Sequence, residues 1–108
     1  MAKERFDAPA QTVYERRLEQ YTRKRPQEVL LVRAEIAGEP EEVVIFRGFA
    51  SSLTRPTDPD PDVPVLPESA RIIAIDRLRS PYDPEHPQYL ETGLTIAAMT
   101  ALLVEVGV

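Results

Sequence analysis

The sequence predicts an α+β fold: a three-stranded antiparallel sheet with an N-terminal and a C-terminal helix and long proline-rich loops. Three observations support this prediction. Apolar residues recur at helical spacing near both ends, an alternating apolar stretch precedes a second apolar strand, and eight of the eleven prolines fall between positions 56 and 87. An SH3-like small barrel is the alternative if the proline-rich segments add short strands. The length of 108 residues favours one domain over residues 11–108, preceded by a flexible segment at residues 1–10.

The first helix is predicted to start at Thr12, the first residue of a T-x-x-E capping box. Tyr14, Leu18 and Tyr21 then recur at i, i+4 and i+7, which places their side chains on one face of the helix. Pro26 has no backbone N–H and ends the helix.

The predicted sheet begins with residues 28–37, where apolar and polar residues alternate. A turn at residues 38–41 leads to a returning strand at 43–49, and a loop this short makes the pair antiparallel. Because residues 43–49 are apolar on both faces, we expect this strand to be central and covered on both sides. Residues 70–78, rich in isoleucine, are the third predicted strand.

The second helix is the clearest local signal in the sequence. Thr95 is a good N-cap residue, and Leu94 and Met99 are spaced as a hydrophobic staple. Gly107 supplies the C-terminal stop. We expect this helix to close the core against the sheet. The predicted core consists of Leu30, Val32, Val44, Phe46, Ile73, Ile75, Met99, Leu102 and Leu103.

The sequence contains no catalytic or cofactor motif. It has no cysteine and only one histidine, His86, so cysteine nucleophiles and the common zinc sites are excluded. The aspartates at positions 58, 60 and 62 alternate as in a calcium loop, but Val63 stands where that loop needs glycine. We therefore expect no catalytic residue, no metal and no cofactor, and predict that the protein is not an enzyme.

The sequence also bears on the compartment. No apolar run approaches the roughly 20 residues needed to span a bilayer. The N-terminus, MAKERFDAPAQ, lacks the apolar region of a secretory signal. We expect a soluble protein in a reducing compartment.

The stretch 41–57 joins the predicted hairpin to the first proline-rich loop and carries arginines and hydroxyl groups. If the strands at 43–46 and 72–75 are neighbours, these side chains converge with later arginines at one edge of the sheet. Arginine forks suit carboxylates and phosphates on a partner. The alternative, which stays open, is that the arginines pair with Asp76, Glu68 or Asp83 of the same chain. The candidate partner-binding residues are Arg47, Ser51, Ser52, Thr54, Arg55, Arg77 and Arg79.

Charge is unevenly distributed along the chain. The net charge is −5, but residues 1–25 hold seven basic and four acidic residues, which gives +3, and the remainder carries −8. This asymmetry supports an alternative function, RNA or DNA binding by the first helix, with Tyr14 and Tyr21 as stacking platforms. The other interpretation is a solvated helix face. The candidate nucleic-acid-binding residues are Arg16, Arg17, Arg23, Lys24 and Arg25.

Two long stretches, KRPQEVLLVRAEIAGEPEEVVIFRGFASSLTRPTDPDPDVPVLPE and IDRLRSPYDPEHPQYL, resemble a family of small uncharacterised proteins of cyanobacteria and plant plastids. The resemblance covers about four-fifths of the chain, from Leu18 onward, and carries no catalytic signature. It implies the cyanobacterial cytoplasm or plastid stroma, and the upkeep of a photosynthetic or gene-expression complex. We therefore expect a protein-binding module, an accessory or assembly factor that joins a protein partner or a larger complex.

Overall fold

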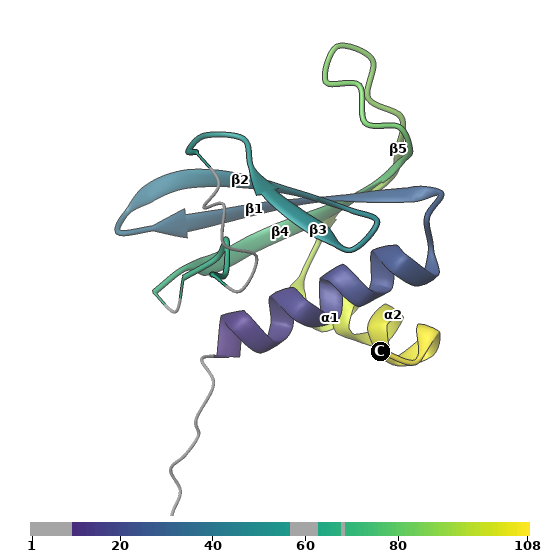
Figure 1. Cartoon of the computed structure of the whole chain (residues 1–108), viewed down its shortest axis with the longest axis horizontal. Helices are drawn as coiled ribbons and strands as arrows, with labels where there is room; N and C mark the ends of the chain where they lie inside the picture. The colour runs from purple at the N-terminus through teal and green to yellow at the C-terminus, as the bar shows by residue number, and fades with distance from the viewer. Residues whose placement is uncertain (1–9, 57–62, 68) are drawn as a thin grey trace, which may run out of the picture.

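A computed structural model describes residues 10–56, 63–67 and 69–108. These residues form two helices and a five-stranded antiparallel sheet, whose strand order is β3-β2-β1-β4-β5 (Figure 1). The segment 1–10, predicted to be flexible, lies outside the described residues except for its last residue, which is helical. The elements are α1 (Ala10–Lys24), β1 (Glu28–Ile36), β2 (Glu39–Phe46), β3 (Phe49–Ser52), β4 (Arg71–Arg79), β5 (Tyr89–Leu94) and α2 (Ile96–Val106).

The prediction of a three-stranded sheet is wrong, because two short edge strands occupy segments that we interpreted as loops. β3 follows a tight turn in which Arg47 and Gly48 have φ angles of 51° and 88°, the left-handed conformations that the favoured two-residue hairpin turn requires. β5 follows the second proline-rich segment. The barrel alternative is wrong as well, because β3 and β5 lie at opposite edges of the sheet.

The central strand is β1 and not β2. β1 pairs with β2 on one side and with β4 on the other, both antiparallel, with Val32 opposite Val43 and Ile75. β2 lies between β1 and the short edge strand β3. The condition for convergence of the arginines, that the strands at 43–46 and 72–75 are neighbours, is therefore not met, because β1 separates them.

Both helices pack on the same face of the sheet (Figure 1). The main core lies between them and that face, and its side chains are almost fully shielded from solvent. Each fully buried aliphatic side chain contributes about 1.5–3 kcal/mol, so this layer supplies most of the apolar stabilisation. Core residues from the helices and the sheet include Leu18, Tyr21, Leu30, Val32, Val43, Ile45, Ile75, Met99 and Leu103.

The helix ends match the sequence prediction in part. Thr95 caps α2 by accepting a hydrogen bond from the Ala98 amide at 3.1 Å, and Gly107 closes it in the left-handed conformation at φ 88°. α1 begins two residues before Thr12, the predicted N-cap, so that boundary is wrong. Neither described helix is long and apolar enough to cross a membrane.

Most of the predicted core is confirmed, but Ile73 is half exposed. The register of β1 against β4 shifts between Arg33 and Ala34, so that Ala34 lies opposite Ile72 and not Ile73. This bulge interrupts the alternation, and Ile72 and Ile75 face the helices. Three further predicted core residues are only partly buried: Leu102 against the main core, and Val44 and Phe46 in a second cluster.

Candidate partner-binding surface

The sheet face opposite the helices, here called the open face, carries no helix among the described elements (Figure 1). Val29, Leu31 and Leu78 form a small apolar cluster at one end of it. Val44, Phe46 and Tyr82 pack partly buried against that cluster. The three cluster residues are themselves buried, so the apolar surface that this end of the face presents to solvent comes from Val44, Phe46 and Tyr82.

Charged side chains occupy the centre of the open face. Arg33 lies directly opposite Glu42 in the β1–β2 register, yet its Nη2 donates to Asp76 Oδ1 at 2.8 Å. The same Asp76 oxygen also accepts from the Gly93 amide at 2.8 Å. Among the described residues the side-chain carboxylate of Glu42 has no hydrogen bond or ion pair, although its backbone carbonyl accepts from the Leu53 amide at 2.8 Å. The buried Nε of Arg33 has no acceptor. The open face thus carries an unpaired carboxylate.

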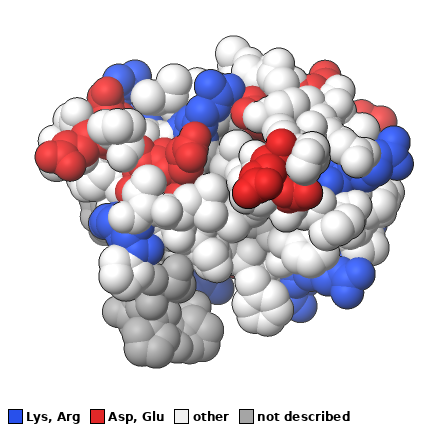
Figure 2. Space-filling model, turned by 90° about the horizontal axis from the view of Figure 1, so that it is seen from above, with Lys and Arg blue, Asp and Glu red and all other residues white. Residues whose placement is uncertain are grey.

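A hollow of about 410 Å³ lies beside these charges. Leu31 and Tyr89 contribute apolar surface to it, and the polar groups come from the neighbouring charged residues and a threonine. Figure 2 shows the molecule from the side of this face, with acidic side chains both toward its middle and at its margins and a basic side chain beside the central acidic ones. The lining residues are Leu31, Arg33, Glu42, Asp76, Tyr89 and Thr92.

Tyr82 links the apolar end of the open face to its charged centre. Burial, followed by the proximity of Glu42 and Tyr89, raises the pKa of the Tyr82 hydroxyl. The ring packs on the apolar cluster while the hydroxyl lies near the unpaired carboxylate. This amphipathic arrangement is common for tyrosine at binding surfaces.

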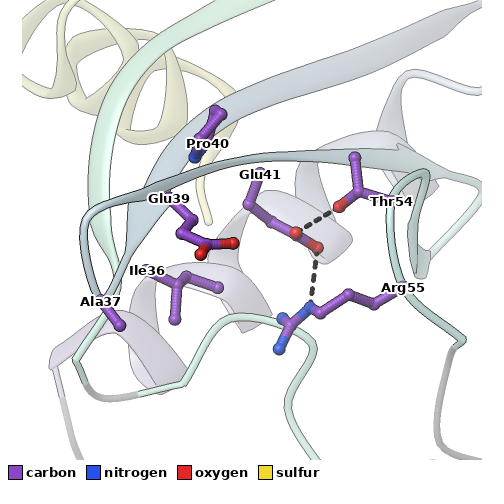
Figure 3. A pocket seen from close by; sticks show the side chains of 7 residues that line it. All are labelled: Ile36, Ala37, Glu39, Pro40, Glu41, Thr54 and Arg55. Carbon is purple, nitrogen blue, oxygen red and sulfur yellow. Dashed lines mark hydrogen bonds and ion pairs between the residues drawn. The ribbon is translucent and has the colours of Figure 1, made fainter.

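Three of the predicted partner-binding residues gather around a buried carboxylate instead; Figure 3 shows two of them, Thr54 and Arg55, beside Glu41. Glu41 is 4% exposed and accepts hydrogen bonds from the hydroxyls of Ser52 and Thr54 and, at 3.2 Å, from Arg55 Nε. Burial would raise the pKa of Glu41, but these donors outweigh it and hold the pKa below its usual range. The three donors therefore hold the loop that follows β3 against strand β2. A pocket of about 270 Å³ adjoins the cluster, lined in addition by Ile36, Ala37, Glu39 and Pro40.

Arg77 lies in a second buried ion pair, on the helix side of the sheet. Its Nε and Nη2 donate to the two oxygens of Glu28 at 2.9 Å each, and the Tyr21 hydroxyl donates to the same carboxylate at 2.8 Å. Burial would raise the pKa of Glu28, but the bonds from Arg77 and Tyr21 hold it below its usual range. Burial and the bond to Glu28 raise the pKa of Tyr21 to about 12. Arg77 also contacts Glu91.

The predicted convergence of arginines at one edge does not occur. Glu28, the partner of Arg77, and Ala34, which lies opposite Glu41, are six residues apart on β1, a separation of about 20 Å. The acidic partners predicted for these arginines within the chain do not pair with them in the described residues. Asp76 pairs with Arg33, Asp83 lies beside His86, and Glu68 is outside the described residues.

The remaining three predicted residues are Arg47, Ser51 and Arg79, and all are exposed. The guanidinium carbon of Arg47 lies 5.1 Å from the centre of the Phe46 ring, a cation–π contact at the β2–β3 turn. Ser51 lies opposite Val44 on the edge strand. Arg79 lies at the end of β4. These residues border the open face without forming a cluster.

The basic residues of α1 are partly engaged within the chain. Arg17 Nη2 donates to the Val108 carbonyl at 2.9 Å. The side chain of Arg23 lies against Gly48, where a β-carbon would come within 2.3 Å of Arg23 Nε. The two tyrosines are engaged as well, because Tyr21 is 1% exposed and the Tyr14 hydroxyl lies 3.0 Å from Thr100 Oγ1. Arg16, Lys24 and Arg25 lie on the same helix and just after it.

A buried acid on α1 anchors the first proline-rich segment. The two oxygens of Glu15 accept from the amides of Val65 and Leu66 at 3.1 and 2.8 Å. Glu15 therefore does not close the predicted capping box. Burial and the neighbouring Glu15 carboxylate raise the pKa of Glu19 to about 7, although Arg16 and Arg23 partly oppose the shift.

In the part of the chain that the structure describes, no three acidic or histidine side chains come close enough to hold a metal ion. His86 is exposed, with its Nδ1 at 3.3 Å from an oxygen of Asp83. The alternating aspartates Asp58, Asp60 and Asp62 lie outside the described residues.

The sequence pattern of one protein family matches residues 15–103 of the chain. It is DUF7734, a domain of unknown function. The chain belongs to this family. The DUF7734 match includes all five strands and the core-facing part of each helix, so a resemblance to a family of unknown function is confirmed. No curated protein and no solved structure matches the chain.

Proposed function

We propose that this DUF7734 domain is a non-enzymatic protein-binding module, an accessory or assembly factor, and that it binds its partner through the open face. The observation that carries the proposal is a sheet covered by helices on one side only, with an apolar cluster and an unpaired carboxylate on the other. The setting proposed is that of the resemblance: a photosynthetic or gene-expression complex in the cyanobacterial cytoplasm or plastid stroma.

The size of the open face supports this function. Five strands about 4.8 Å apart, of up to nine residues that rise about 3.3 Å each, give on the order of 600 Å² before side-chain relief is counted. A standard protein interface buries about 800 Å² on each partner. The flat area of the open face is thus about three-quarters of that value, and the relief of the side chains adds accessible surface, so this face alone approaches the size of a standard interface. The partly exposed Val44, Phe46 and Tyr82 and the charged centre also supply the two components, apolar contacts and directional polar ones, that interfaces combine.

The arginine and hydroxyl residues that first suggested a partner make a poor test of this function. Arg55 and Thr54 bind the buried Glu41, so a glutamate at position 55 would face that carboxylate and weaken the fold itself. Residues of the open face whose side chains are partly exposed offer a cleaner test. Val44 and Tyr89 meet this condition.

The decisive experiment is affinity purification from the native organism, with and without nuclease, followed by mass spectrometry. We expect Val44→Ser/Tyr89→Ser to reduce recovery of the partner at least tenfold. The matched control is Val13→Ser/Val104→Ser, because these two valines are also exposed but lie on the helices; it should recover the partner normally. Thermal melts of both variants show whether each is folded.

Equal recovery by both variants would reject the open face as the docking surface. Loss of all partners on nuclease treatment would instead favour the alternative, nucleic-acid binding through α1. With Tyr14 and Tyr21 engaged in the fold, that alternative rests on the basic side chains alone, and binding would weaken steeply with salt.

A further inference from the structure

The pairing of Arg33 explains why Glu42 is left without a partner. Two carboxylates lie near Arg33: Glu42 is directly opposite it on β2, and Asp76 lies two residues along β4 from the residue opposite it, within hydrogen-bonding distance. The Asp76 side chain is 5% exposed, whereas Glu42 is open to solvent. Leaving a buried charge uncompensated costs more than leaving an exposed one, so Arg33 remains with Asp76. Glu42 is therefore available to a cation from outside the chain.

The hollow beside Glu42 has the surfaces that a long basic side chain needs. Leu31 and Tyr89 line it with aliphatic and aromatic surface, against which the methylene stem of a lysine or arginine can pack. The Tyr89 ring, half exposed, also offers a face to a cation. Glu42 supplies the counter-charge at the wall of the same hollow. These groups converge from β1, β2 and β5.

We propose that this hollow binds an arginine or lysine side chain of the protein partner, with Glu42 as its counter-ion. The inference rests on the proposed function and specifies the chemistry of the partner: a segment that presents a basic residue among apolar ones. Charge complementarity supports it, because acidic side chains lie toward the middle of this face (Figure 2). A second copy of the chain offers the same acidic centre, so face-to-face pairing of two copies brings like charges together.

Arg33 has a positioning role in this arrangement. Its guanidinium neutralises Asp76 and so limits the negative charge of the hollow to Glu42. Its side chain is 44% exposed although Nε is buried, so a peptide carbonyl of the partner can approach the terminal nitrogens of the guanidinium. The site therefore favours a basic residue within a peptide over a free metal or ammonium ion.

The test uses a capped peptide, acetyl-Leu-Arg-Leu-amide, titrated into the ¹⁵N-labelled protein by NMR. The control peptide carries citrulline, which has the shape of arginine without its charge. We expect the arginine peptide to shift the amide signals of Leu31, Glu42 and Thr92, and the citrulline peptide to bind at least tenfold more weakly.

Substitutions in the protein test which carboxylate pairs with the basic side chain of the peptide. We expect Glu42→Gln to weaken binding of the arginine peptide at least tenfold. The matched control is Glu39→Gln, a second acid on β2, which lines the pocket near Glu41 and not the hollow; it should leave the affinity unchanged. Equal binding of the two peptides, equal loss in the two variants, or no shift at about 10 mM peptide would overturn the inference.

The same variants separate this inference from the proposed function. If Val44→Ser/Tyr89→Ser loses the native partner but Glu42→Gln retains it, the open face is the docking surface and the basic-residue site is rejected. If both variants retain the partner, the docking surface is rejected and the hollow loses its role with it. Loss of the partner in both, with Glu39→Gln unaffected, supports both proposals.

Discussion

On β1, neighbouring residues face opposite sides of the sheet: Leu30 and Val32 meet the helices, whereas Leu31 and Arg33 lie on the open face. On the helix side, the acids Glu28 and Glu41 are buried and each accepts several hydrogen bonds. On the open face the apolar cluster is smaller and a carboxylate stays unpaired. The difference indicates that the helix-covered face contributes most of the stability, whereas the open face keeps a charged group that no described residue pairs with.

The largest expected effect comes from the apolar side chains of β2, which alternate between the two faces. Ile45 is fully buried against the helices, and Val44 is partly buried on the open face. We expect Ile45→Ala to cost about 2–5 kcal/mol of unfolding free energy, because it leaves a cavity. Val44→Ala should cost about 1 kcal/mol. Urea denaturation measures both. Similar costs for the two would show that the open face is covered in solution.

The second largest expected effect on stability comes from breaking a buried ion pair as opposed to an exposed one. Arg77→Met leaves the Glu28 carboxylate buried without its arginine, and we expect a loss of about 3 kcal/mol of unfolding free energy. This value is at the lower end of the range for broken buried ion pairs, because the Tyr21 hydroxyl still donates a hydrogen bond to Glu28. The exposed pair of Arg71 and Glu35 is the control, and Arg71→Met should cost about 0–1 kcal/mol. A double variant, Glu28→Leu/Arg77→Met, should recover much of the loss. If Arg77→Met melts like the wild type, Glu28 is hydrated and not buried.

The smallest expected effect is a pH dependence of the unfolding free energy, which arises from Glu19 on α1. The pKa of Glu19 is raised from 4.5 to about 7, so the folded chain holds this proton more tightly than the unfolded chain. Its contribution to stability is present below pH 4.5 and is lost as the pH rises through about 7. The lowered pKa values of Glu28 and Glu41 act in the opposite sense, and their contribution is lost as the pH falls below 4.5.

We therefore expect Glu19→Gln to remove the decline in stability between about pH 5 and about pH 8. Urea melts across this range measure it. Ser51→Ala, on the open side of the edge strand and without a titratable group, should leave the decline unchanged. If the stability of Glu19→Gln declines with pH as much as that of the wild type, the decline arises from another titratable group.

Local signals in the sequence predicted the elements that are most regular. The alternation over residues 28–37 located β1, and Thr95 with Gly107 located α2 almost to the residue. β3 was missed because Phe49–Ser52 is short and rich in small and polar residues, and it becomes a strand only by pairing with β2. Tertiary pairing outweighs the weak intrinsic preference of such a segment.

The candidate site was less predictable than the fold. Alternation placed Arg33 opposite to Leu30 and Val32 on its strand, but only the register brings it between Glu42 and Asp76. The bulge that exposes Ile73 also leaves no sequence signal. Above all, the open face exists because both helices pack on one side of the sheet, and periodicity within each helix does not specify which side.

The central position of β1 affects how the chain folds while it is being synthesised. Its hairpin with β2 involves neighbouring segments and can form early, whereas its pairing with β4 joins residues such as Arg33 and Asp76 that are 43 positions apart. Met99 and Leu103 complete the core only when α2 has left the ribosome. Until then Leu30, Val32 and Ile45 remain exposed on the nascent hairpin. A chain that has emerged from the ribosome only as far as β3 would therefore present an apolar hairpin to chaperones and not a folded domain.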